Sequence, residues 1–195
     1  MNLIVDDRMI PGTILKKADM GNTTGLDFLN KIFYISDGIM MSQIRSISGI
    51  DTSTLQNWVK RHWVGSAKLK KYDIDQVAHI LIINMLRSCM QLDRIAFLIQ
   101  YINGKIDDSG DDIIEDSILY DYICKILDKL MTYEVCSLGS VQSTIAEITA
   151  DYEENLPGAR ERLSKALEII VIAYYAALIK RHSDSMLEEI FDKRF

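Results

Sequence analysis

The residues best suited to chemistry in this chain are a group of short polar side chains followed by a run of cations. Residues 52–57 carry hydroxyl and amide groups, and Asn and Gln can pair bidentately with adenine. Five cations and no acid follow between residues 60 and 71. Polar groups that contact bases, next to cations that contact phosphate, are typical of nucleic-acid binding. The candidate DNA-binding residues are Thr52, Ser53, Thr54, Gln56, Asn57, Lys60, Arg61, Lys68, Lys70, Lys71 and Tyr72.

Two short helices are expected to position these side chains. Residues 41–48 and 52–62 have helical patterns, and Gly49-Ile50-Asp51 between them can end one helix and begin the next. These are the parts of a helix-turn-helix, whose second helix presents its N-terminal residues to base edges. Gly65-Ser66-Ala67 supplies a turn in the basic run, which predicts a short hairpin wing between Val64 and Tyr72. The same pattern also fits an ordinary helical hairpin with a solvated basic loop.

The rest of the chain predicts helices and few strands. With 2 Pro and 10 Gly in 195 residues, the turn signals of a sandwich or barrel are missing. Apolar spacings of three and four predict helices at 23–35, 73–88, 92–103, 113–131, 140–152 and 159–182, with a turn or two more at 185–191. The helix after Asp73 begins on a capping box with Gln76 and is apolar on nearly every side, which predicts a central position. The predicted fold class is all-α.

Charge divides the chain unevenly. The net charge is −6, yet residues 39–105 hold nine Lys and Arg against four Asp and Glu, for +5. Residues 106–195 hold nine against nineteen, for −10. Together with the break at residues 103–112, this predicts three parts: an arm and short helix at 1–38, a basic module at 39–105, and an acidic helical module at 106–195.

Residues 39–103 resemble the DNA-binding domain of MerR-type regulators. The resemblance rests on Met41–Ile50, Thr54–Lys60, Lys70–Asp73, the apolar helix that follows, and Met90–Ile95. Residues 55–64, 70–72 and 80–86 more closely resemble an uncharacterised bacterial family, domain of unknown function 1836, and this likeness continues into residues 107–130. The resemblance implies a winged helix that binds DNA.

The leading interpretation is therefore a cytoplasmic transcriptional regulator whose winged helix-turn-helix binds double-stranded DNA. The acidic half would form a homodimer through residues 163–178, or bind a small-molecule or protein effector, with Tyr174 and Tyr175 as polar groups of a pocket. The alternative is a winged-helix protein-interaction module that does not bind DNA. Ser53 and Gln56 favour that alternative because MerR-type proteins usually have Arg there, as does the pI of about 5.1.

Enzyme, metal and membrane functions are not predicted. His62, His79 and His182 lack metal-ligand spacing, and no phosphate-binding or dinucleotide-binding loop occurs, so no cofactor is expected. His79 is expected to be a hydrogen-bonded core residue. The three cysteines, Cys89, Cys124 and Cys136, are expected to be buried reduced thiols. The apolar run at 169–179 is too short to span a bilayer, and no secretory signal is visible, which predicts a cytoplasmic location.

Overall fold

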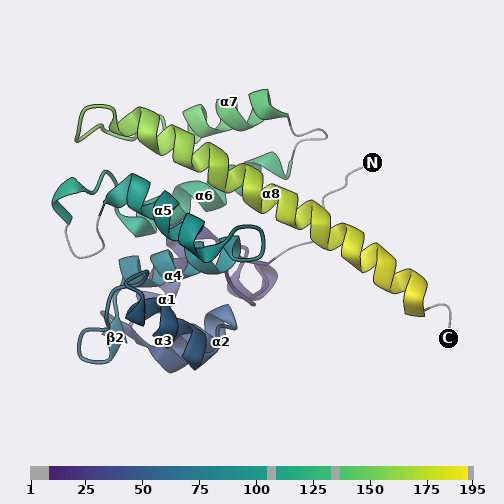
Figure 1. Ribbon diagram of the computed structural model, residues 1–195, viewed down its shortest axis with the longest axis horizontal. Coiled ribbons are helices and arrows are strands. Elements are labelled where there is room, and N and C mark those ends of the chain that lie inside the picture. Colours follow the sequence, from purple (N-terminus) through teal and green to yellow (C-terminus); the bar gives the residue numbers. More distant parts are fainter. Residues whose placement is uncertain (1–8, 105–108, 133–136, 193–195) are drawn as a thin grey trace.

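The computed structural model describes residues 9–104, 109–132 and 137–192, which fold mostly into helices as predicted. Within these ranges, helices stack in layers with a small two-stranded sheet at one end (Figure 1). The helices are α1 (Gly25–Phe33), α2 (Met41–Ser48), α3 (Thr52–Lys60), α4 (Ile74–Leu86), α5 (Leu92–Asn103), α6 (Asp116–Leu130), α7 (Leu138–Ile148) and α8 (Ala159–Asp192), with short 3₁₀ turns at Ala18–Met20 and Ser109–Asp111. The sheet, α2 and α3 lie at the end opposite α7 and α8 (Figure 1).

Helix α4 lies at the centre, as its apolar sequence predicted. It packs against α1, α2, α5, α6 and α8, and most of its residues are buried. The predicted capping box begins it: the Asp73 carboxylate accepts from the Gln76 N–H at 2.9 Å, and the Gln76 side-chain oxygen accepts from the Asp73 N–H at 3.1 Å. These two bonds satisfy donors that a helix N-terminus otherwise leaves unpaired.

The sheet differs from the prediction. Strand β1 (Ile39–Met40) pairs antiparallel with β2 (Lys71–Tyr72), with Ile39 opposite Tyr72. The prediction that strands occur only between Val64 and Tyr72 was therefore wrong, because β1 precedes α2. A two-residue strand is too short to show the alternation by which strands are recognised in a sequence.

Helix α8 is longer than expected. It runs from Ala159 to Asp192 without the interruption predicted near His182. No Gly or Pro occurs in this span, and an ion pair of 2.6 Å between Lys180 and Asp184 bridges the expected break. The buried residues of α8 begin at Ala159 and end at Leu178, and beyond that point the helix projects from the body (Figure 1).

The three predicted parts share one buried core. Helix α1 packs on α4 and α6, and α4 packs on α6, so contacts cross both predicted boundaries. The Leu26 N–H donates to Asp121 at 2.8 Å, and the Tyr120 hydroxyl donates to the Pro11 carbonyl at 2.7 Å. The division at 38/39 and 105/106 stays a prediction. None of the helices in the described ranges has the length and apolar content needed to cross a membrane.

Candidate functional site

The turn between α2 and α3 forms as its residue types predicted. Gly49 has a φ of +70°, a left-handed conformation that suits glycine, and its N–H donates to the Arg45 carbonyl at 2.9 Å. Asp51 then caps α3 by accepting from the Thr54 N–H at 2.8 Å. Leu55 and Trp58 are buried and hold α3 on the core. Because these anchors lie on one face, the opposite face of α3 points to solvent.

That outer face carries four of the candidate residues. Ser53, Gln56, Asn57 and Lys60 are exposed and spaced by three, one and three residues, which places them in one patch along the helix. Thr52 and Thr54 are half-buried at its edge. The patch offers amide, hydroxyl and ammonium groups, the types that contact bases and phosphates.

Asp51 sets the charge at the start of α3. Hydrogen bonds from the Ser53 hydroxyl, the Thr54 hydroxyl and the Thr54 N–H lower the pKa of its carboxyl. The carboxylate is therefore ionised at neutral pH and compensates the positive end of the helix dipole. The carboxylate therefore disfavours a second anion at this helix end, where an uncapped N-terminus would attract one.

The basic run forms a tight hairpin. Lys68 and Lys71 exchange two backbone hydrogen bonds of 2.9 Å each, which leaves Leu69 and Lys70 as its tip. Both tip residues have positive φ, +51° and +64°, as in a type I′ turn. Lys68, Lys70 and Lys71 are exposed, and Leu69 is 98% exposed. The Lys71 ammonium also donates to the Ser36 hydroxyl at 3.1 Å.

The structure places ten of the eleven candidates at the surface and one inside. Tyr72 is 2% exposed, because successive residues of β2 point to opposite faces and Lys71 takes the outer one. Its ring therefore cannot contact a ligand at this surface, which corrects that assignment. Arg61 is exposed, with its guanidinium 5.1 Å from the centre of the Trp63 ring and its Nε 3.4 Å from the Asn57 oxygen.

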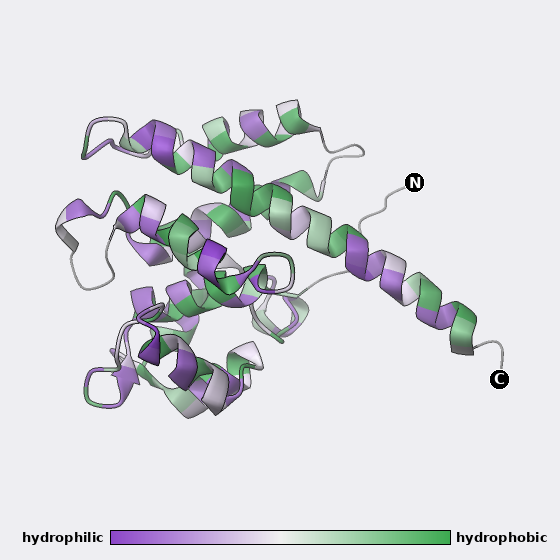
Figure 2. Cartoon of the chain, in the orientation of Figure 1, coloured by the Kyte–Doolittle hydropathy of each residue, from purple (hydrophilic) through white to green (hydrophobic). Residues whose placement is uncertain are grey.

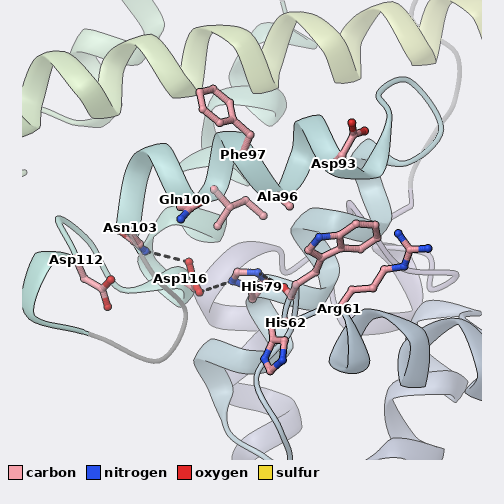
Figure 3. Close-up of a pocket in the computed structure, with 13 residues that line it drawn as sticks. Arg61, His62, His79, Asp93, Ala96, Phe97, Gln100, Asn103, Asp112 and Asp116 are labelled. Carbon is pink, nitrogen blue, oxygen red and sulfur yellow. Dashed lines mark hydrogen bonds and ion pairs between the residues drawn. The ribbon is translucent and has the colours of Figure 1, made fainter.

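A cavity of about 610 Å³, which the sequence did not indicate, lies next to this surface (Figure 3). Arg61, His62 and Trp63, just after α3, form one wall. Helix α5 supplies another, including Asp93 and Gln100, and His79 and Asp116 lie at the base. These residues come from different segments of the chain, and no spacing in the sequence connects them.

His79 bridges two acceptors at the base of the cavity. Its Nδ1 lies 2.7 Å from an Asp116 oxygen and its Nε2 lies 2.9 Å from the Trp63 carbonyl, so the predicted hydrogen-bonded core role is confirmed. Burial disfavours the charged ring, but the Asp116 carboxylate, the Trp63 carbonyl and the charge of Asp112 outweigh it and raise the pKa of His79. Both partners are acceptors, so only the doubly protonated ring satisfies both bonds.

A smaller cavity of about 380 Å³ lies among α5, α7 and α8. Its lining includes Tyr101, Gln142 and Glu168, but neither Tyr174 nor Tyr175, the polar groups predicted for a pocket in this half. Tyr174 is instead buried in the core. Among the residues the structure describes, no three His, Cys, Asp or Glu side chains are grouped so that they could hold a metal ion.

The cysteine predictions met different outcomes. Cys124 is buried on α6, and burial raises the pKa of its thiol to about 12, which keeps it protonated. Cys89 is exposed, which corrects the prediction, because it lies just beyond the last turn of the buried helix α4. Cys136 lies outside the described residues.

Comparison with known proteins finds similarity over the part of the chain that carries the α3 surface. Uncharacterized protein YkrK of Bacillus subtilis (strain 168) is 26% identical over 149 residues, which cover 72% of this chain and 63% of that relative. The chain thus spans less than two thirds of the relative's length. No solved structure matches the chain at a significant level. Residues 28–123, from α1 into α6, match the family model described as Domain of unknown function (DUF1836), in agreement with the resemblance found in the sequence.

Proposed function

We propose that this protein binds double-stranded DNA as a MerR-like, winged helix-turn-helix regulator of transcription. The observation that carries the proposal is the exposed polar row of Ser53, Gln56, Asn57 and Lys60 on a helix whose other face is buried. This row lies at the same end of the molecule as the Lys68–Lys71 hairpin (Figure 1). An α-helix fits the major groove, so a helix with one polar face and one anchored face suits base contact.

Each group has a distinct role in this proposal. Gln56 and Asn57 present amides that can contact base edges bidentately, while Ser53 contributes a hydroxyl near the start of the helix. Lys60 and Arg61 follow at the other end of the row and meet the phosphate backbone. The hairpin lysines meet the backbone at a second place, which orients α3 in the groove.

Salt dependence tests the proposal. We expect purified protein to shift genomic DNA fragments at low salt, with an affinity that falls as salt rises. Replacing Lys68, Lys70 and Lys71 together by Ala should reduce the slope of log K against log salt by roughly two to three, at about 0.9 per lost phosphate contact. A control variant with Lys16, Lys31 and Lys165 replaced by Ala changes the net charge equally and should keep the parent slope.

Two results bear against DNA binding. The first is the absence of any shift by the parent protein at low salt. The second is an equal loss of slope in the control variant, because the hairpin lysines would then have no special role. Replacing Asn57 by Ala adds a check on base contact: it should weaken binding to a selected site by about 1–3 kcal/mol and leave nonspecific binding unchanged.

A second candidate function is a winged-helix module that binds a protein instead of DNA. Exposed apolar side chains near the hairpin favour it: Tyr34 is 88% exposed, Ile35 is 93% exposed, and Leu69 is at the hairpin tip. Large exposed apolar groups are typical of protein contact surfaces. The same assay distinguishes the two functions, because only the DNA-binding function predicts that the protein shifts DNA fragments at low salt.

Within this proposal, the helices after residue 105 provide regulation. The cavity lined by Arg61 and Trp63 reaches α5 and the start of α6, and it has a volume in the range of small-molecule sites. An effector bound there would contact Arg61 directly and so change the cations available to DNA. Isothermal titration with and without an operator fragment would measure such coupling.

A further inference from the structure

The tip of the basic hairpin carries a large apolar side chain from which the fold gains almost nothing. Leu69 is 98% exposed, so its side chain is left almost wholly in water. It forms the centre of the turn together with Lys70, and the backbone hydrogen bonds between Lys68 and Lys71 close that turn. Figure 2 shows hydrophobic and hydrophilic residues mixed along this loop, which leads into β2.

The same turn also strains the backbone. Leu69 has a φ of +51° and Lys70 a φ of +64°, and both values lie in the left-handed region. Turns of this type usually contain Asn and Gly, because these residues adopt left-handed dihedrals at little cost. Leu69 therefore combines backbone strain with an exposed apolar side chain. Strained positions cluster where a ligand contact compensates for them, so this combination indicates a contact outside the chain.

The charges around Leu69 select the kind of partner. Lys68, Lys70 and Lys71 are exposed, and no acid occurs between residues 60 and 71. Lys68 and Lys71 lie directly opposite each other in the hairpin, so their side chains leave the same face. Duplex DNA complements both features, because its minor groove has phosphates along both edges and stacked, apolar bases between them.

The hairpin is held in a fixed position relative to α3. Strand β2 pairs with β1, and Tyr72 of β2 is buried in the core. The Lys71 ammonium adds its hydrogen bond to the Ser36 hydroxyl. The hairpin and α3 lie at the same end of the molecule (Figure 1), so a duplex that takes α3 in its major groove brings the next minor groove to the hairpin. A tip anchored in this way loses little conformational freedom on binding.

We propose that Leu69 inserts into the minor groove beside the α3 site and separates two stacked base pairs, while the hairpin lysines contact the phosphates on either side. This inference rests on the proposed function, because it requires duplex DNA as the partner. An apolar wedge of this kind bends the duplex toward the major groove. Pyrimidine–purine steps such as TA unstack most easily, so Leu69 selects them without any hydrogen bond to a base.

The fluorescence of 2-aminopurine, which rises when the base unstacks, tests the insertion. The probe is moved along a duplex that carries a site selected from genomic fragments by the parent protein. The parent should raise the fluorescence at one step outside the α3 contacts, and gel shifts with circularly permuted fragments should show a bend of about 20° or more. A TA step at that place should bind more tightly than an AA step.

Replacing Leu69 by Ala should abolish the fluorescence rise and reduce the bend. The affinity should fall about 5- to 20-fold, because less apolar surface is removed from water. The slope of log K against log salt should stay that of the parent, since no charge changes. Leu69→Met should keep most of the fluorescence rise, because Met also serves as a wedge.

Two control variants separate the wedge from a structural role. Leu138→Ala removes a leucine that is 64% exposed on α7, at the opposite end of the molecule, and should bind and bend DNA like the parent. Leu69→Asn places a residue that tolerates left-handed dihedrals at the tip. This variant should be at least as stable as the parent in urea and yet lose the fluorescence rise. A merely structural residue would lose stability and the DNA effect together.

The outcomes distinguish this inference from the proposed function. If the parent shifts DNA but raises the fluorescence at no probe position, the insertion is overturned and DNA binding stands. Equal affinity of Leu69→Ala and Leu138→Ala leads to the same conclusion. If the parent shifts no DNA at low salt, the proposed function fails and the insertion fails with it, and the exposed leucine then supports the protein-binding module.

Discussion

Replacing His79 by Gln removes a charged bridge between the segment after α3, the central helix α4 and the start of α6. The ring donates from Nδ1 to Asp116 at 2.7 Å and from Nε2 to the Trp63 carbonyl at 2.9 Å when both nitrogens are protonated. Burial opposes this charge. The Asp116 carboxylate, the Trp63 carbonyl and the charge of Asp112 outweigh burial and raise the pKa of His79. His79 should therefore be an imidazolium in the folded protein at pH 6.

The raised pKa fixes the sign of the pH dependence. Protons bind His79 more tightly in the folded state than in the unfolded state, whose pKa is about 6.5. The contribution is therefore complete below about pH 6.5, and it is lost as the pH rises through the folded-state pKa. Each unit of difference between the two pKa values corresponds to about 1.4 kcal/mol. The contribution of His79 to the free energy of unfolding should therefore fall as the pH rises above about 6.5, by about 1.4 kcal/mol for each unit by which the two pKa values differ.

The size of the mutational effect depends on the interactions that the Asp116 carboxylate retains when His79 is replaced. Breaking a buried ion pair costs about 3–5 kcal/mol when the remaining charge is left alone. Asp116 retains a bond of 3.1 Å from the Asn103 amide and its side chain is 18% exposed. We therefore expect His79→Gln to destabilise the protein by about 2–4 kcal/mol at pH 6, somewhat less than the full penalty.

Urea unfolding of the parent and His79→Gln between pH 6 and 9 measures both quantities. The two curves of unfolding free energy against pH should converge as the pH rises. His62→Gln is the matched control, because His62 is exposed. Nitrogen-15 shifts of the ring should show two protonated nitrogens at pH 6. A ring with one unprotonated nitrogen at that pH, or an unchanged separation between the curves, would refute the reasoning.

Two further predictions concern local backbone structure. Replacing Leu69 by Asn and Lys70 by Gly should stabilise the protein by about 1–3 kcal/mol, as measured by urea unfolding. The reason is that left-handed backbone dihedrals cost about 1–2 kcal/mol in ordinary residues. A lower stability would contradict the turn geometry. Replacing Asp73 by Ala should destabilise it by about 1 kcal/mol through loss of the capping box at α4, measured by thermal unfolding. An unchanged melting temperature would mean that the cap contributes nothing.

Features encoded within a few consecutive residues could be predicted from the sequence. The bounds of α2, a Thr or Asp cap at the start of α3 and the capping box of α4 were predicted because each depends on residues at most four apart, and the structure shows Asp51 as the cap of α3. The outer row of α3 followed from the same local periodicity. The two-residue strand β1 was missed, since so short a strand carries no periodic signal.

Tertiary packing decided the features that connect distant residues or choose between equivalent faces. His79 and Asp116 lie 37 positions apart, and no spacing rule joins them, so their bridge and the cavity above it exist only in the folded chain. Alternation along β2 allowed either Lys71 or Tyr72 to point outward, and pairing with Ile39 turned Tyr72 inward. Helix α8 is apolar on nearly every side between residues 169 and 179. Its sequence therefore determined that a helix forms there. Packing against α5, α6 and α7 determined which face of this helix is buried and which is exposed, because burial depends on neighbours that periodicity does not specify.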